Sequence, residues 1–149
     1  MIIPGKGTKL YKIGAHKDSI DFSTIEILEV DNREGLDVIK TELIWFFIDN
    51  KYQKIDQISA FLPFEGKVLN KIGLGDSLAS AYYAFGKCVV NYKAHEPIEY
   101  PGISFETEKG SRSPNAIISC ISVFDPYKSY TQIPSHISNN LTGKGRKLP

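Results

Sequence analysis

Apolar and polar residues alternate along several short stretches of the chain, a pattern typical of strands that bury one face. A continuous apolar run at 43–48 predicts a strand covered on both faces. Turn residues at 31–35 and 50–54 separate neighbouring strands, because Asp, Asn and Gly accept the backbone angles of tight turns. The strands that this pattern predicts are 24–30, 36–39, 42–49, 55–61, 88–92, 103–107 and 115–124.

Two helices are expected. Apolar residues recur with helical spacing at Leu78, Ala81, Tyr82 and Phe85, which predicts a helix over 78–85 with one face toward a core. Asp76 or Ser77 caps its start, and Gly86 ends it. A shorter helix is expected after Asp18-Ser19, and 94–101 is expected to be a loop because prolines interrupt it.

Two pairs of segments share residues at constant offsets. Residues 7–14 and 66–73 share Gly, Leu, Lys, Ile and Gly 59 positions apart, and 58–64 resembles 121–127 at an offset of 63. The similarity predicts an internal duplication, with copies at about 2–64 and 65–127. The expected fold is α+β: two tandem helix-plus-antiparallel-strand repeats that form one continuous antiparallel sheet with helices on one face. Residues 1–127 are then a single domain.

The last residues, 128–149, lack apolar periodicity and are expected to form a partly disordered C-terminal tail. Within it, Ile133, Ile137 and Leu141 are candidates to lie against the domain.

Composition narrows the range of functions. The chain has 149 residues, 42% hydrophobic, which is enough for one globular core. Its net charge of +1 and dispersed lysines give no sign of a nucleic-acid-binding protein. The N-terminus lacks a basic segment followed by an apolar run, and the longest apolar run is too short to span a bilayer. We therefore expect a cytoplasmic protein that binds neither nucleic acid nor membranes.

No catalytic or metal motif stands out. His16, His95 and His136 fall in predicted loops, without a second ligand at metal spacing. Cys88 and Cys120 form no CxxC, and no serine lies in a G-x-S-x-G elbow. A Cys88–His95 pair stays open, although Cys88 begins a predicted core strand, where thiols are usually inert. The sequence predicts neither an enzyme nor a cofactor or metal site.

Charge is unevenly distributed. Residues 15–49 hold nine acidic and three basic side chains, a net charge of −6 in a chain of net +1. A solvated strand face explains this imbalance, and so does an acidic surface for a basic partner. Tyrosines such as Tyr52 and Tyr83 are likewise either partner anchors or sheet residues with wet hydroxyls.

The segment Lys-Ile-Gly-Leu-Gly-Asp-Ser at 71–77, with Ile-Ser-Val-Phe at 121–124, resembles the tandem α+β repeats of β-lactamase-inhibitor-like proteins. Residues 3–7, 64–67 and 102–106 resemble small bacterial immunity proteins of polymorphic or contact-dependent growth inhibition toxin systems. Together these resemblances cover roughly 2–127.

This resemblance implies a protein that binds a cognate toxin domain, often a basic nuclease, and occludes its active site without catalytic residues. The acidic stretch is then the contact surface, with Trp45 as a further candidate anchor or a core residue. The partner-binding residues that follow are Glu26, Glu29, Asp31, Arg33, Glu34, Asp37, Glu42 and Tyr52. Two other classes stay open, an intracellular adaptor for a peptide or lipid and an enzyme, and the oligomeric state is not predicted.

Overall fold

The computed structural model describes residues 1–128. The expectations for the tail, including His136 and the three apolar residues that follow Gln132, lie outside these residues. The elements in chain order are η1 (Lys17–Ser19), η2 (Phe22–Thr24), β1 (Glu29–Arg33), β2 (Leu36–Lys40), β3 (Ile44–Asp49), β4 (Lys54–Phe61), β5 (Lys67–Val68), β6 (Ile72–Gly73), α1 (Leu78–Phe85), β7 (Cys88–Asn91), β8 (Ala94–Pro97), β9 (Ile103–Thr107), η3 (Glu108–Gly110) and β10 (Ile118–Phe124).

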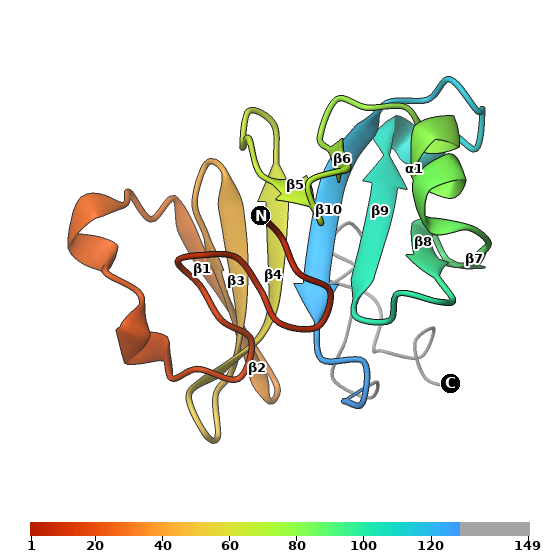
Figure 1. Cartoon of the computed structure of the whole chain (residues 1–149). Coiled ribbons are helices and arrows are strands. Elements are labelled where there is room, and N and C mark those ends of the chain that lie inside the picture. The colour runs from red at the N-terminus through yellow and green to blue at the C-terminus, as the bar shows by residue number, and fades with distance from the viewer. Residues whose placement is uncertain (129–149) are drawn as a thin grey trace.

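Eight strands form one antiparallel sheet in the order β1-β2-β3-β4-β10-β9-β8-β7 (Figure 1). Each strand of β1–β4 pairs with the next strand in sequence, and so does each strand of β7–β10. The two groups meet along β4 and β10, in a register that places Ser59 opposite Ser122. Strands β1 and β7 are therefore the two terminal strands of this sheet.

The expected α+β fold of two tandem repeats with helices on one face is wrong. The structure is mostly antiparallel sheet with a single α-helix in residues 1–128, and the first half has two 3-10 turns where a helix was expected. The apolar residues there, Ile20, Phe22 and Ile25, lack the spacing of a helical stripe. Residues 66–73 form most of the β5–β6 hairpin instead of a helix start.

The predictions for individual elements were partly confirmed and partly wrong. Helix α1 has the predicted bounds, with Ser77 as its N-cap and Gly86 as its C-cap. The strand predicted at 24–30 is displaced, because β1 begins at Glu29 and only Glu34 and Gly35 turn the chain into β2. The loop predicted at 94–101 is wrong in its first half, where β8 lies between β7 and β9.

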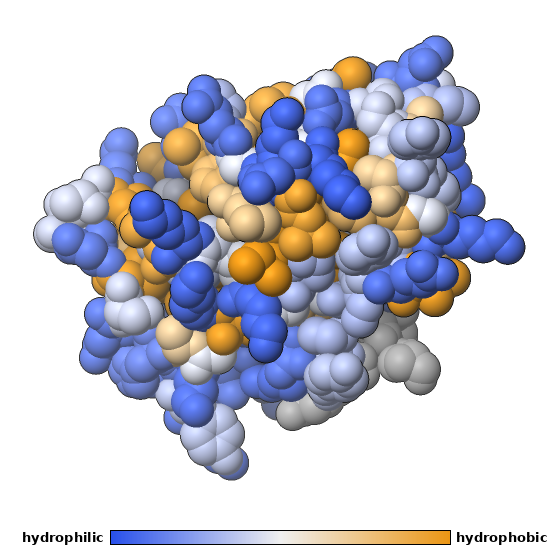
Figure 2. Space-filling model, in the orientation of Figure 1, coloured by the Kyte–Doolittle hydropathy of each residue, from blue (hydrophilic) through white to orange (hydrophobic). Residues whose placement is uncertain are grey.

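One face of the sheet carries most of the apolar core. Residues from β2, β3 and β4 form one buried cluster with Ile20, and residues from β9, β10 and α1 form another with Ile2 and Val68. The N-terminal segment and the β5–β6 hairpin lie across this face (Figure 1). Its outer surface is mostly hydrophilic, with hydrophobic side chains reaching it in scattered places (Figure 2).

The second face is different in kind. The register places Trp45, Ser59, Ser122 and Ser104 in one row across β3, β4, β10 and β9. The three serines are buried, as are Leu36, Val38, Phe47, Gln57, Glu106 and Cys120. This face thus has a small apolar cluster at the β2–β3 side and buried polar groups in the middle.

Candidate functional site

The acidic residues singled out in the sequence surround the β1–β2 hairpin at one end of the sheet. Three of them, Glu29, Asp31 and Asp37, lie within β1 and β2, and the structure divides the full set between the two ends of the hairpin. Glu29 and Arg33 are separated by four residue steps of strand, or about 13 Å. The predicted acidic surface is therefore divided into groups at the two ends of the hairpin and along its strands.

The first group lies where the chain enters β1. Glu26 and Glu42 are exposed and line a cavity of ≈ 280 Å³ together with Leu28. The buried side chains of Ile44 and Phe46 form apolar parts of its lining. Within residues 1–128, neither glutamate makes an ion pair or a side-chain hydrogen bond. The cavity therefore combines an apolar interior with two carboxylates that reach solvent.

The carboxylates on β1 and β2 are largely engaged within the hairpin. Arg33 binds Asp31 through both Nε (2.9 Å) and Nη2 (2.6 Å), because residues two apart on a strand share a face. Glu29 lies 3.5 Å from Lys40 Nζ. Asp37 accepts a hydrogen bond from Asn32 Nδ2 at 2.9 Å. Asp31 and Glu29 therefore contribute less free negative charge than the sequence count indicates, whereas the hydrogen bond to Asp37 comes from an uncharged amide.

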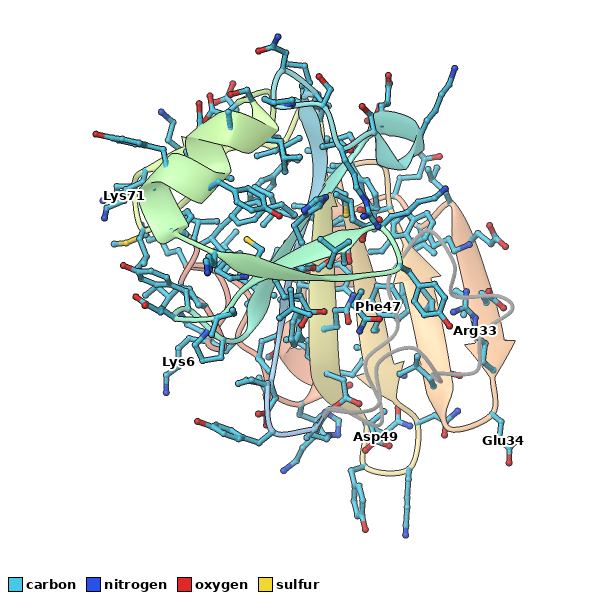
Figure 3. The ribbon with its side chains drawn as sticks, turned by 90° about the vertical axis from the view of Figure 1, so that its right-hand side faces the viewer. Lys6, Arg33, Glu34, Phe47, Asp49 and Lys71 are labelled. Atoms are coloured by element: carbon cyan, nitrogen blue, oxygen red, sulfur yellow. The ribbon has the colours of Figure 1, made fainter. Side chains whose placement is uncertain are left out.

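The second group lies at the opposite end of the hairpin. Glu34 is exposed in the β1–β2 turn, and Tyr52 is exposed in the β3–β4 turn. The two turns are joined by Asn50, whose backbone N–H donates to Gly35 O (3.3 Å) and whose Nδ2 donates to Arg33 O (3.3 Å). Figure 3 shows Glu34 at this end of the sheet, with Asp49 on the neighbouring hairpin. Glu34 and Tyr52 therefore lie at one end of the hairpin strands, and Glu26 and Glu42 lie at the other end.

Trp45 is half-buried on the second face of the sheet. Its ring lies 5.1 Å from that of Phe61, and Lys40 Nζ lies 4.4 Å from its centroid. It also lines a second cavity of ≈ 280 Å³, shared with Glu106, Lys93 and Cys120. The tryptophan is thus packed between its neighbours and is not a freely exposed anchor.

Three exposed apolar side chains beside the acidic groups did not enter the predicted site. Ile27, Leu28 and Val30 are 41%, 59% and 48% exposed. The sequence placed them inside a strand at 24–30, where alternation favours burial of every second residue. Their exposure follows from the displaced start of β1. A strand that begins at Glu29 carries its apolar residues at the edge of the sheet.

The histidine predictions were partly wrong. His95 is buried in β8, and its Nδ1 lies 2.8 Å from the hydroxyl of Tyr82 on α1. Burial lowers the pKa of His95, and the nearby charge of Arg112 lowers it further. Burial also raises the pKa of the Cys88 thiol, with the Tyr82 hydroxyl as a neighbour. Cys88 and His95 both neighbour the Tyr82 hydroxyl, but the raised pKa of Cys88 disfavours the thiolate that a nucleophile needs.

A metal-binding cluster and a membrane-spanning helix are both absent from residues 1–128. In the part of the chain that the structure describes, no group of three or more His, Cys, Asp or Glu side chains is arranged to hold a metal ion. No helix within residues 1–128 has both the length and the apolar character needed to cross a membrane.

No protein-family model and no curated protein matches the chain. Among solved structures, the chain is similar to the uncharacterized protein yfeY from Escherichia coli, with a TM-score of 0.54 and 13% sequence identity. The similarity covers 83% of this chain and 99% of that one. At this identity the likeness concerns the fold alone.

Proposed function

We propose that this protein is a binding domain that neutralises a basic protein partner, as an immunity protein neutralises its cognate toxin domain. The contact surface is the β1–β2 hairpin with the segment that leads into it. The partner is a cognate toxin domain, with a basic nuclease the expected kind, and the action is occlusion of its active site. The proposal requires no catalytic residue, cofactor or metal.

One observation carries this proposal. Glu26, Glu34 and Glu42 are exposed and have no cation within ion-pair distance in residues 1–128. The exposed side chain of Leu28 lines the same cavity as Glu26 and Glu42, and the exposed Val30 follows two residues later in β1. Apolar groups that are desolvated on binding supply affinity, and complementary charges speed the encounter and reject wrong partners.

A location in the cytoplasm is part of the proposal. Cys88 and Cys120 are not joined in a disulfide, which suits a reducing compartment, and an immunity protein acts in the cell that must be protected.

The test uses the protein encoded beside this one in its genome. Growth of cells that express this neighbour, with and without our protein, measures neutralisation, and surface plasmon resonance measures association. We expect growth rescue and a complex of low-nanomolar Kd. The absence of both rescue and binding for every neighbouring toxin domain would overturn the proposal.

Charge reversal locates the surface. Glu26→Lys with Glu42→Lys should slow association by about ten-fold and reduce its dependence on salt, because both charges face the partner. The matched control is Glu65→Lys with Glu99→Lys, two exposed glutamates outside the hairpin, for which the rate should stay within about two-fold. Equal rates for the two double variants would move the interface away from β1.

A further inference from the structure

We propose that β1 binds an extended, basic segment of the partner as a ninth, antiparallel strand of the sheet. This inference rests on the proposed function, since it specifies how the partner is held. It concerns backbone pairing, which charge complementarity alone does not require.

The backbone direction of β1 follows from the neighbouring hairpin. Thr41 N–H donates to Ile44 O at 2.9 Å, which fixes residue 41 as facing β3. Backbone groups alternate along a strand, so Lys40, Val38 and Leu36 face β1. Their register partners Glu29, Asp31 and Arg33 therefore face β2, and Val30 and Asn32 direct their N–H and C=O away from the sheet.

No strand in residues 1–128 pairs with the outer edge of β1. The register between β1 and β2 is continuous over all five residues, and β1 contains no proline. Natural edge strands are usually protected by prolines, bulges or lysines. Here the only irregularity lies before the strand, where Leu28 N–H also donates to Lys40 O. Figure 3 shows Arg33 and Glu34 at this end of the sheet.

The other terminal strand of the sheet, β7, differs from β1 in the charges around it. Strand β7 has four residues and is flanked by the exposed lysines Lys87 and Lys93. Lysines at a sheet edge oppose the approach of another strand. Strand β1 has acidic neighbours instead, and they oppose only a strand of the same sign.

The charges select the occupant. A second copy of this chain would bring the same excess of acidic side chains to β1, since Glu26, Glu34 and Glu42 have no cation within ion-pair distance in residues 1–128, and the like charges would repel. A segment that alternates apolar residues with lysine or arginine would cover Val30 on one face and neutralise the glutamates. The cavity near the start of β1 suits a long basic side chain, with its stem against Phe46 and its charge near Glu26 and Glu42.

The probe is a capped eight-residue peptide that alternates lysine and valine, added to the full-length protein. Amide chemical shifts of 15N-labelled protein report the site. We expect saturable shifts concentrated at Val30 and Asn32. The same peptide with an N-methyl group on every residue should bind at least ten-fold more weakly, because it has no N–H donor to pair with β1 along either edge. Equal binding of the two peptides, or shifts confined to other strands, would overturn strand addition.

Two variants extend the test to the natural partner. Val30→Pro removes the outward N–H, a change that an edge strand tolerates, and Val30→Thr keeps the N–H and the β-branched shape. We expect Val30→Pro to weaken partner binding at least ten-fold and Val30→Thr to change it less than two-fold. Thermal denaturation establishes that each variant is folded, and the peptide experiment on the unaltered protein stands if Val30→Pro is not.

The outcomes separate the two proposals. Partner binding that is sensitive to charge reversal but not to Val30→Pro would leave the proposed function standing and overturn strand addition. Peptide pairing at β1 without growth rescue would support strand addition and count against the neutralising function. A concentration-dependent dimer of the protein alone, lost in Val30→Pro, would overturn the basic partner as the occupant of this edge.

Discussion

Ser59 and Ser122 lie face to face where the two halves of the sheet join, and removing either hydroxyl tests how that seam is stabilised. Their Oγ atoms are 2.7 Å apart, and both residues are buried. Gln57 Nε2 also donates to Ser59 Oγ at 3.2 Å. Ser59 thus accepts one hydrogen bond and shares a second.

The magnitudes follow from what each substitution leaves behind. Ser122→Ala removes the partner of one buried hydroxyl and should lower the free energy of unfolding by about 1–2 kcal/mol. Ser59→Ala also takes an acceptor from Gln57 and should cost about 2–3 kcal/mol. The double variant removes both hydroxyls, so no serine hydroxyl is left buried without its hydrogen-bond partner. Its cost should therefore fall short of the sum of the single costs by about 1 kcal/mol.

The assay is urea denaturation of the four proteins at pH 7, followed by circular dichroism, with Tm as a second readout. Each kcal/mol should lower Tm by about 3 °C for a chain of this size. Ser119→Ala is the control, because Ser119 is half-buried and its bond to Glu106 O is long at 3.4 Å. It should cost less than about 0.5 kcal/mol. Single costs that add within about 0.3 kcal/mol would refute the coupling of the two hydroxyls.

Three further predictions concern the same fold. Gly102→Ala should destabilise the protein by more than about 3 kcal/mol, since the new Cβ would lie 2.4 Å from Gly5 N. Gly35 also has a positive φ but borders open space, so Gly35→Ala should cost only about 1 kcal/mol. Urea unfolding of the two variants measures the difference. Burial lowers the pKa of His95, so the unfolded chain takes up the proton at a higher pH than the folded protein, and stability should fall as pH drops below about 6.5. Urea denaturation at pH 7.5 and 5.5 measures this loss of stability, which His95→Gln should remove. Burial raises the pKa of Asp56, despite its 2.6 Å contact with Lys128, so the contribution of Asp56 to stability should decline as pH rises above about 4. Relative to the unaltered protein, Asp56→Asn should therefore gain stability between pH 4 and 7. A stability difference between the two proteins that is the same at both pH values would contradict the raised pKa.

Local patterns predicted those elements whose residues agree with their packing. Helix α1 has an apolar stripe, a serine cap and a terminal glycine, and all three signals are local. Strand β9 alternates within its own five residues but is buried on both faces. Its alternation therefore located the strand without describing its environment, which the neighbouring strands decide.

Non-local pairing explains the main errors. The start of β1 is set by its register with β2 and by Gly35 at φ 79°, so apolar alternation further upstream was misleading. Strand β8 has only four residues, one of them a proline, and a strand this short gives no periodic signal. His95 is buried because α1 packs over it, a contact 13 positions away in sequence. The repeated residues at 7–14 and 66–73 carried no information about whether a helix followed.

The site was predicted only in part. Counting charges located the acidic hairpin, but it did not distinguish paired from free carboxylates. The Asp31–Arg33 pair had a readable signal, since opposite charges two apart on a strand share a face. The cavity beside Glu26 and Glu42 had none, because its lining comes from five separate stretches of the chain.

An acidic edge strand has a second purpose that needs no partner, because like charges prevent two sheets from joining edge to edge. The two purposes make different demands on the sequence. Protection requires charge of either sign close to β1, so reversing Glu26 and Glu42 to lysine should leave the oligomeric state of the protein unchanged. Recognition requires a particular sign next to apolar surface. The exposed Leu28 and Val30 oppose protection, since apolar edge residues promote association, yet they favour recognition. Exposed apolar residues near glutamates without an ion-pair partner are therefore what the proposed recognition requires and what protection alone would not.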